Sequence, residues 1–233
     1  MTPRDPTRHP LALTPGYFSS LHRAPRAGLI ALDPEAADMR GPVFGAGDIG
    51  PMDGDLIRNA ARPGGTALGP RIVVHGAVLD EAGRGVPGAL LEIWQANAGG
   101  RYRHARDGYL APLDPDFAGA GRVLTDADGA YRFDTIMPGA YPFPNGPNAW
   151  RPAHIHFSVF GWSFAQRLVT QMYFEGDPMI AHCPIVATLP DAEAVEALIA
   201  RYDPDRDRPM DARAFRFDIV LRGRRATPME GVA

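Results

Sequence analysis

Residues 150–160 read WRPAHIHFSVF and predict a β-strand over 153–160. Aromatic and β-branched residues are frequent in this run, as is typical of strands. Because side chains alternate between the two faces of a strand, Ile155 and Phe157 share one face and His154 and His156 share the other. The Cα atoms of the two histidines would lie about 6.6 Å apart, close enough for both imidazoles to reach one metal ion. The run therefore predicts a core strand and a candidate metal site.

Short strands and turns continue on both sides of this run. Strand-like segments are expected at 71–79, 89–95, 122–125, 130–134, 167–174 and 215–221. We expect one hairpin between 71–79 and 89–95, turning at 80–85. A second hairpin is expected at Asp128-Gly129, a pair that is common in tight hairpin turns. The pattern predicts an all-β protein whose core is an antiparallel β-sandwich with one or two short helices.

Two further segments complete the predicted architecture. A helix is expected over Asp191–Tyr202, where Val195, Leu198, Ile199 and Tyr202 recur at helical spacing. Residues 1–68 contain scattered prolines and glycines with little periodicity. Such a segment predicts an extended N-terminal arm that packs on a neighbouring subunit. The chain is thus expected to consist of this arm, 1–68, and a β-sandwich domain, 69–233.

The composition of the 233-residue chain excludes several classes of protein. All 24 residues counted as Lys+Arg are arginine, which excludes lysine Schiff-base chemistry and a P-loop lysine. Cys183 is the single cysteine, so internal disulfides and thiolate-rich metal sites are excluded and a metal must bind nitrogen and oxygen. The net charge of −3 argues against a nucleic-acid partner, and no apolar run has the length of a membrane span. We expect a cytoplasmic protein with no nucleic-acid or membrane partner.

The donors that would accompany the two histidines define the class of site. Alone, a His-x-His pair in a strand is as often explained by ordinary hydrogen bonding as by metal binding. A cupin glutamate is missing at 159–161, and no nearby acid completes a triad of two histidines and one carboxylate. Tyrosine is the next hard oxygen donor, and Tyr109 and Tyr141 lie upstream among glycines and prolines, although most tyrosines only pack. Two phenolates and two imidazoles would favour Fe³⁺ over Fe²⁺.

Four stretches of the chain resemble the intradiol ring-cleavage dioxygenases. They read QANAGGRYRH (95–104), YLAPLDP (109–115), WRPAHIHFS (150–158) and QMYFEGD (171–177). The likeness runs from about Tyr17 to the RGRRAT segment at 222–227. The chain departs from the family at Phe143, where tryptophan is usual, and in the loops 118–121 and 144–148. These departures concern the fit of the substrate rather than the metal.

The resemblance implies a β-sandwich enzyme with one Fe³⁺ per chain. By matching the family's motifs, the iron ligands would be Tyr109, Tyr141, His154 and His156. Tyr141 would also take a proton when the substrate displaces it. The implied activity is cleavage of a catecholic diol with O₂, which would convert protocatechuate to 3-carboxy-cis,cis-muconate. Residues 69–233 would form the catalytic domain.

The resemblance also implies roles for residues around the metal. Arg151 would lie over the substrate ring and stabilise its anionic character, and Gln171 would orient that arginine. Tyr17 and Ile185 would line the substrate pocket, with a homologous α subunit completing it in an αβ heterodimer or higher oligomer. A catechol or hydroxyquinol 1,2-dioxygenase is the alternative within the family, although residues 1–68 are too proline-rich for the helical linker of those enzymes. A catalytically silent structural subunit is the alternative from another class.

Overall fold

The computed structural model describes residues 6–27, 46–160 and 167–230. Their strands are β1 (Arg71–Leu79), β2 (Leu90–Gln95), β3 (Ala120–Leu124), β4 (Ala130–Ile136), β5 (Tyr141–Pro142), β6 (Trp150–Arg151), β7 (His154–Phe160), β8 (Arg167–Phe174), β9 (Ile199–Tyr202), β10 (Ala212–Arg216) and β11 (Ile219–Val220). Their helices are α1 (Phe18–Arg23), α3 (Ala192–Glu196) and the 3₁₀ turns η1 (Pro6–Arg8), η2 (Ala46–Asp48), η3 (Pro178–His182), η4 (Val186–Thr188) and η5 (Pro204–Arg206). None of these helices is long and apolar enough to span a membrane. The predicted all-β class with short helices is confirmed.

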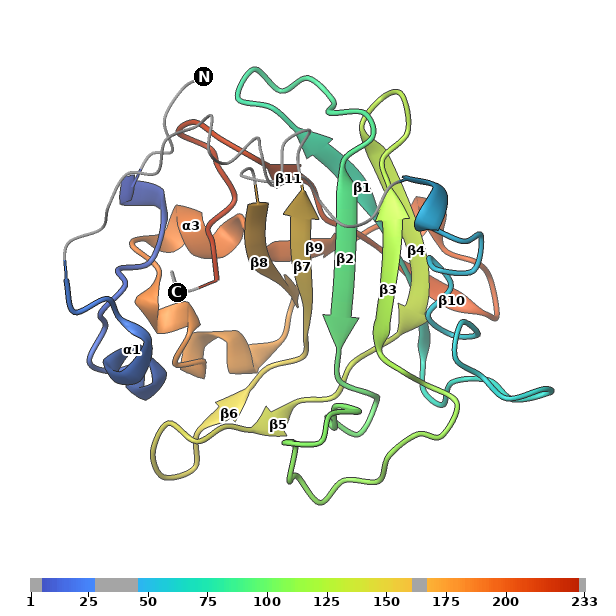
Figure 1. Cartoon of the computed structure of the whole chain (residues 1–233), viewed down its shortest axis with the longest axis horizontal. Coiled ribbons are helices and arrows are strands. Elements are labelled where there is room, and N and C mark those ends of the chain that lie inside the picture. Colours follow the sequence, from blue (N-terminus) through green and yellow to red (C-terminus); the bar gives the residue numbers. More distant parts are fainter. Residues whose placement is uncertain (1–5, 28–45, 161–166, 231–233) are drawn as a thin grey trace.

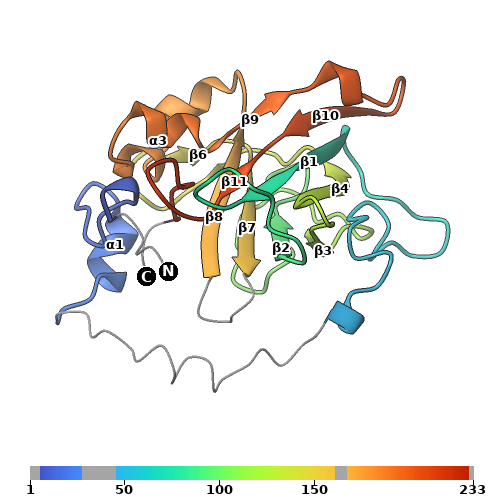
Figure 2. The ribbon, with the colours of Figure 1, turned by 90° about the horizontal axis from the view of Figure 1, so that it is seen from above.

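The strands form two layers that face each other (Figures 1 and 2). The hydrogen-bonded order is β11-β1-β10-β9-β8-β7-β2-β3, and β4 pairs with β1. One layer holds β4, β1, β10 and β11, and the other holds β3, β2, β7 and β8. Strand β9 joins the layers, because it pairs with β10 on one side and β8 on the other. The pairs β1–β10, β1–β11 and β8–β9 are parallel, so the sandwich is mixed rather than wholly antiparallel.

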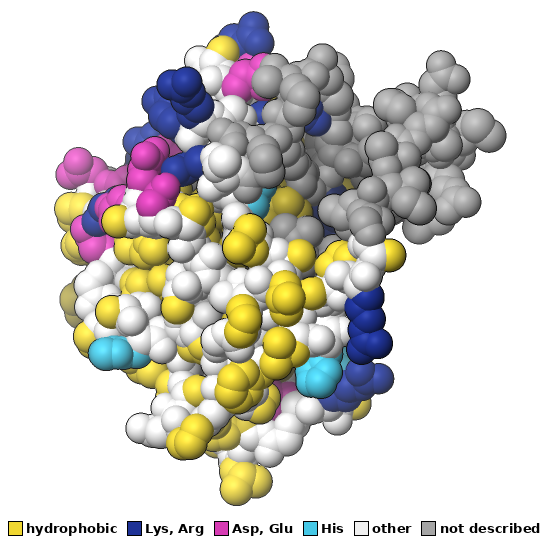
Figure 3. Space-filling view, turned by 90° about the vertical axis from the view of Figure 1, so that its left-hand side faces the viewer, with side chains coloured by type: hydrophobic (Ala, Val, Ile, Leu, Met, Phe, Trp, Pro, Cys, Tyr) yellow, Lys and Arg dark blue, Asp and Glu magenta, His cyan; other side chains and the backbone are white. Residues whose placement is uncertain are grey.

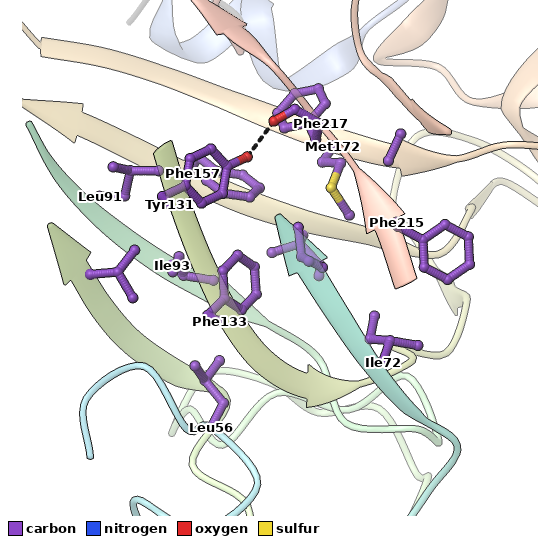
Figure 4. Packing of buried hydrophobic residues seen from close by; sticks show 14 of the residues in the cluster. Leu56, Ile72, Leu91, Ile93, Tyr131, Phe133, Phe157, Met172, Phe215 and Phe217 are labelled. Carbon is purple, nitrogen blue, oxygen red and sulfur yellow. Dashed lines mark hydrogen bonds between the residues drawn. The ribbon is translucent and has the colours of Figure 1, made fainter. Parts of the chain in front are cut away.

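The core lies between the layers and is centred on β7, which is buried along its whole length. Phe157 is fully buried, and its ring centroid lies 5.4 to 6.2 Å from those of Phe217, Phe133 and Tyr131 (Figure 4). The Tyr131 hydroxyl donates a 2.6 Å hydrogen bond to the Phe217 carbonyl, so the polar end of this buried ring is satisfied. This packing fixes the inward face of β7, and with it the direction in which the two histidines of the opposite face point.

Both predicted hairpins are wrong, although their strands are present. Strand β1 pairs with β4, β10 and β11 but not with β2, which pairs with β3 and β7. The turn at Gly129 is tight, with φ of 78° and two backbone N–H groups donating to Asp126 Oδ1. It nevertheless connects β3 in one layer to β4 in the other. The turn itself was therefore predicted correctly. The strand partners were not, because burial of apolar faces between the layers determines them.

The predicted helix over 191–202 is correct only in its first half. Helix α3 begins after Asp191, whose side chain accepts from the Ala194 N–H, and it ends at Glu196. Residues 199–202 form β9 instead, with Ile199 beside Tyr173 of β8. The backbone hydrogen bonds that join the two layers outweigh the helical spacing of the apolar residues here.

Part of the predicted arm packs on its own chain. Leu56 and Ile57 are buried in the main core, and the Leu56 N–H donates to the Asp134 carbonyl of β4. Tyr17, just before α1, is buried in a second cluster. Helices α1 and α3 lie on the same side of the sandwich (Figures 1 and 2). The division into 1–68 and 69–233 stays a prediction.

Candidate active site

Each of the two histidines of β7 has one ring nitrogen, Nδ1, bonded to a fixed acceptor, and its other ring nitrogen, Nε2, directed at the site. His154 Nδ1 lies 2.7 Å from the Pro152 carbonyl, and His156 Nδ1 lies 2.9 Å from Glu230 Oε2. A carbonyl and a carboxylate only accept hydrogen bonds, so each Nδ1 donates, which places the lone pair of a neutral imidazole on Nε2. Burial, followed by the nearby charge of Arg151, lowers the pKa of His154 well below its usual value and keeps it neutral. Both Nε2 atoms are therefore available as donors to a metal.

Two tyrosine hydroxyls meet these Nε2 atoms. Tyr141 Oη, at the start of β5, lies 3.2 Å from His154 Nε2. Tyr102 Oη lies 3.1 Å from His156 Nε2 and 3.4 Å from His154 Nε2. Burial raises the pKa of both phenols, most strongly that of Tyr102, so neither is ionised without a compensating cation. Two phenol oxygens and two imidazole nitrogens thus converge.

Tyr109 is not part of this group. Its ring packs edge-on against Trp150 at 6.4 Å, and its backbone N–H donates to Asp107 Oδ1. The other carboxylate oxygen of Asp107 accepts from the Tyr102 N–H, so one aspartate fixes both ends of the loop. The structure brings Tyr102 to the histidines where the sequence motif had suggested Tyr109, which lies on the wall of the same cavity.

Glycines allow a close approach between the loops that carry Tyr102 and Tyr141. The Asn97 carbonyl accepts hydrogen bonds from the N–H groups of both Gly100 and Gly139. Gly100 has φ of 84°, a conformation that favours glycine, and a Cβ there would collide with the Ala140 carbonyl. A Cβ on Gly139 would collide with the neighbouring loop at Ala98. This close backbone approach allows two tyrosines from distant segments to share one site.

Arg151 lies beside the four donors and is almost fully buried, with 2% of its surface exposed. Its guanidinium donates to Gln171 Oε1 and to Tyr173 Oη, and it lies 5.6 Å from the centre of the Phe143 ring. Burial alone lowers the pKa of the guanidinium, but the acidic groups around it, Tyr173 first, raise the net pKa above its usual value. Arg151 is therefore a permanent positive charge. Strand β6 ends at this arginine and β7 begins at His154, so the break at Pro152 lets both side chains face the site.

Tyr17 and Ile185 lie in the second buried cluster, together with Tyr173 and Cys183. The Tyr17 hydroxyl accepts from Arg23, and its ring centroid is 6.1 Å from that of Phe143. Both residues thus belong to the cluster that contains Tyr173 and against which Phe143 packs. That they line a substrate pocket stays a prediction.

A cavity of about 600 Å³ opens in front of the site. Its walls include Trp94, Tyr102, Tyr109, Tyr141, Phe143 and His156. Trp94 stacks on the His156 ring with centroids 4.8 Å apart and planes 4° apart. The aromatic lining and the volume suit a small aromatic ligand.

The donor set fits a hard, highly charged metal ion. Among the described residues, no group of three or more His, Cys, Asp or Glu side chains could hold a metal. The four-donor group of Tyr102, Tyr141, His154 and His156 could do so, because both Nδ1 atoms bond elsewhere while the two phenol oxygens and two Nε2 atoms contact one another at 3.1 to 3.4 Å. Phenol oxygens that gain charge on binding match Fe³⁺ better than a soft or monovalent ion.

Four residues of the site were not predicted from the sequence: Trp94, Tyr102, Tyr173 and Glu230. Tyr102 lies within the quoted stretch 95–104 and Tyr173 lies on the same face of β8 as Gln171, so both were within reach of pattern analysis. Trp94 lies opposite His156 in the β2–β7 register, which only strand pairing reveals. Glu230 lies 74 residues from His156, and no local signal connects the two.

Comparisons with known proteins show the family to which the chain belongs. A family model described as Dioxygenase matches residues 39–223, and one described as Protocatechuate 3,4-dioxygenase beta subunit N terminal matches residues 2–35. The solved structure of 3-chlorocatechol 1,2-dioxygenase from Rhodococcus opacus 1CP superposes with a TM-score of 0.55 at 26% identity, over 77% of this chain and 69% of that one. The chain belongs to the intradiol ring-cleaving dioxygenase family.

Two further relatives are the beta chain and the alpha chain of protocatechuate 3,4-dioxygenases. The protocatechuate 3,4-dioxygenase beta chain of Burkholderia cepacia is 55% identical over 230 residues, which cover 99% of this chain and 97% of the relative. The alpha chain of protocatechuate 3,4-dioxygenase from Pseudomonas putida is 31% identical over 173 residues, covering 73% and 80%. Within the family, the chain is thus similar to the beta chain along nearly its full length.

Proposed function

We propose that this chain is the iron-binding subunit of an enzyme that cleaves protocatechuate with O₂ to 3-carboxy-cis,cis-muconate. The observation that carries the proposal is the convergence of two phenol oxygens and two imidazole Nε2 atoms beside an aromatic cavity. The similarity to a protocatechuate 3,4-dioxygenase beta chain supports the choice of substrate. The iron ligands we propose are Tyr102, Tyr141, His154 and His156, with Tyr102 in place of Tyr109.

Ferric iron bound there would supply Lewis acidity and draw electrons from a catecholic diol. The protein's part is to hold the ring and to manage protons. Burial raises the pKa of the Tyr141 phenol, so its oxygen is a good proton acceptor once it no longer faces a cation. We therefore assign to Tyr141 Oη the uptake of one substrate hydroxyl proton.

Arg151 supplies a positive charge that would stabilise anionic character in the substrate ring. Gln171 and Tyr173 hold the guanidinium by one nitrogen, while the Nε of Arg151 is buried without a hydrogen-bond partner among the described residues. A buried N–H without a partner is costly, and an anionic ligand would satisfy it. A fixed charge in a site shielded from water stabilises developing negative charge far more than it would in water.

Two alternatives differ in ways that can be measured. Relatives named catechol 1,2-dioxygenase and chlorocatechol 1,2-dioxygenase match about half of this chain, so catechol or hydroxyquinol remains the alternative substrate. Phe143 at the cavity wall, where the family usually has tryptophan, bears on that choice. A silent structural subunit would have no need of four converging donors, which disfavours this reading.

An apolar face supports an α-type partner subunit. Leu11, Leu13, Phe18 and Leu21, in and before α1, expose about half or more of their surface. Figure 3 shows the side of the molecule that carries α1, with hydrophobic side chains across its middle. Exposed apolar groups that gather on one face commonly mark a protein interface. We propose that a homologous α chain covers this face and completes the substrate pocket.

The test is to purify the chain with and without a co-expressed α-type subunit, and to measure iron content, visible spectrum and ring cleavage. We expect one iron per chain and a red-brown colour from phenolate-to-iron charge transfer. Protocatechuate should be cleaved faster than catechol or hydroxyquinol, and only in the presence of the partner. A colourless protein with full metal occupancy would overturn the iron site. Full and selective activity without a partner would overturn the heteromeric pocket.

A further inference from the structure

The two histidines of the site differ in what holds them. His154 Nδ1 donates to a neutral backbone carbonyl, that of Pro152, at 2.7 Å. His156 Nδ1 donates to the carboxylate of Glu230 at 2.9 Å. A hydrogen bond to a carboxylate is stronger than one to a neutral carbonyl, and it makes the imidazole a better electron donor at its other nitrogen. Among the described residues, no other carboxylate bonds directly to one of the four donors.

Glu230 is brought to the site by a strap formed by residues 228–230. The Thr170 hydroxyl donates to the Pro228 carbonyl at 2.6 Å, and the Glu230 N–H donates to the Val169 carbonyl at 2.7 Å. The Met229 N–H donates to His9 Nδ1, near the other end of the chain, at 3.2 Å. The strap thus lies along β8, the strand that pairs with β7 beside His156. Its anchors are backbone groups of the strap, so the Glu230 side chain is free to contact the imidazole.

We propose that Glu230 is a positioning residue that fixes His156 in its Nδ1–H form and makes His156 the stronger of the two imidazole donors to iron. The inference rests on the proposed iron site. The carboxylate also places a negative charge near the guanidinium of Arg151, so the site as a whole carries less positive charge. An iron ion with a stronger donor is harder to reduce, which raises the energy of phenolate-to-iron charge transfer.

The test compares Glu230→Ala, Glu230→Gln and a remote control, Glu175→Gln. Glu175 pairs with the exposed Arg201, so the control makes the same chemical change away from the site. Metal-free samples labelled with ¹⁵N-histidine report the tautomer of His156 by NMR. Iron titration reports the dissociation constant, and the visible spectrum of the iron-bound protein reports the charge-transfer band.

In Glu230→Ala we expect the Nδ1–H tautomer of His156 to lose its dominance, iron affinity to fall about 10–100-fold, and the band to move to longer wavelength. Glu230→Gln keeps an acceptor oxygen without the charge, so the tautomer should be retained and the band should lie between the other two. Glu175→Gln should match the unmodified protein. If Glu230→Ala keeps the tautomer and the band position, the inference is wrong, even if iron binding weakens. An unmodified protein that binds no iron would refute the proposed function, while the metal-free tautomer would still decide the role of Glu230.

Discussion

Replacing Tyr102 and Tyr109 separately by phenylalanine tests the ligand assignment with a matched control. The two tyrosines lie on one loop and both line the cavity, but only the Tyr102 hydroxyl contacts the histidines, at 3.1 and 3.4 Å. Each change removes one oxygen atom and leaves the ring in place. The pair therefore separates the loss of a metal donor from the loss of a cavity hydroxyl.

The expected magnitude follows from what the Tyr102 oxygen does. Removing a group that only supports a metal ligand typically costs 10–100-fold in affinity, so loss of one of four ligands should cost about 100-fold or more, or about 2.7 kcal/mol. In the metal-free protein the same change removes one hydrogen bond to an imidazole, which is worth about 0.5–1.5 kcal/mol. Tyr102→Phe should therefore stay folded and lose iron, whereas Tyr109→Phe should keep both.

The assay is iron titration followed by the visible spectrum, with urea unfolding of the metal-free variants as the check on folding. Tyr102→Phe protein that is forced to bind iron should lack the absorption of one of its two phenolates. The reasoning fails if Tyr109→Phe loses iron and colour while Tyr102→Phe keeps them, because the ligand would then be the tyrosine that the family motif first suggested.

Three more predictions concern the charge, the core and an ion pair. Arg151→Ala should keep iron but lower turnover about 100-fold or more, and an unchanged kcat would contradict its electrostatic role. Phe157→Ala should lower the free energy of unfolding by about 3–5 kcal/mol in a denaturant titration, since the ring is fully buried among three aromatic rings; a loss below about 1 kcal/mol would mean that the core refills the space. The side-chain hydrogen bond from Arg62 lowers the pKa of Asp116 from 3.8 to about 2, so the ionised carboxylate stabilises the fold above pH 3.8 and loses that effect as the pH falls through 2. The stability difference between the unmodified chain and Asp116→Asn should accordingly be constant near neutral pH, shrink below pH 3.8 and vanish only below pH 2; a difference that does not shrink over this range would refute the ion pair as its source.

Strand positions could be read from the sequence because the signal for a strand is local. The segments 71–79 and 167–174 are found as β1 and β8 with the expected bounds. Strand partners are not local, and both hairpin predictions failed for that reason. A turn such as Asp128-Gly129 requires only a change of direction, and the chain uses it to pass between layers. Which strands pair is decided by the burial of apolar faces between layers, and a turn motif contains no information about that.

The candidate site shows the same division between local and distant information. The pair His154 and His156 follows from the alternation of one strand, and the structure places both against tyrosine hydroxyls, with His156 on the cavity wall. Tyr102 and Tyr109 lie seven residues apart in one irregular loop, where no periodicity states which side chain points inward. The hydrogen bonds of the Asn97 carbonyl to Gly100 and Gly139 settle the loop's path, and the second of these partners lies more than 40 residues away in sequence.

The donors of the site come from segments that are far apart in the sequence. Because one layer of strands cannot supply them all, the site lies at the end of the sandwich (Figure 1). Within a layer, the backbone is occupied by strand pairing and side chains alternate between two fixed faces, so only a pair such as His154 and His156 can be offered from one strand. Donors that approach from other directions must come from segments where the backbone is free to turn. Tyr102 comes from the connection between β2 and β3, and Tyr141 from the short strand β5, both beside His154, the first residue of β7. The sandwich thus fixes the direction of the imidazoles, and segments outside its two layers, the β2–β3 connection and the short strand β5, supply the phenols.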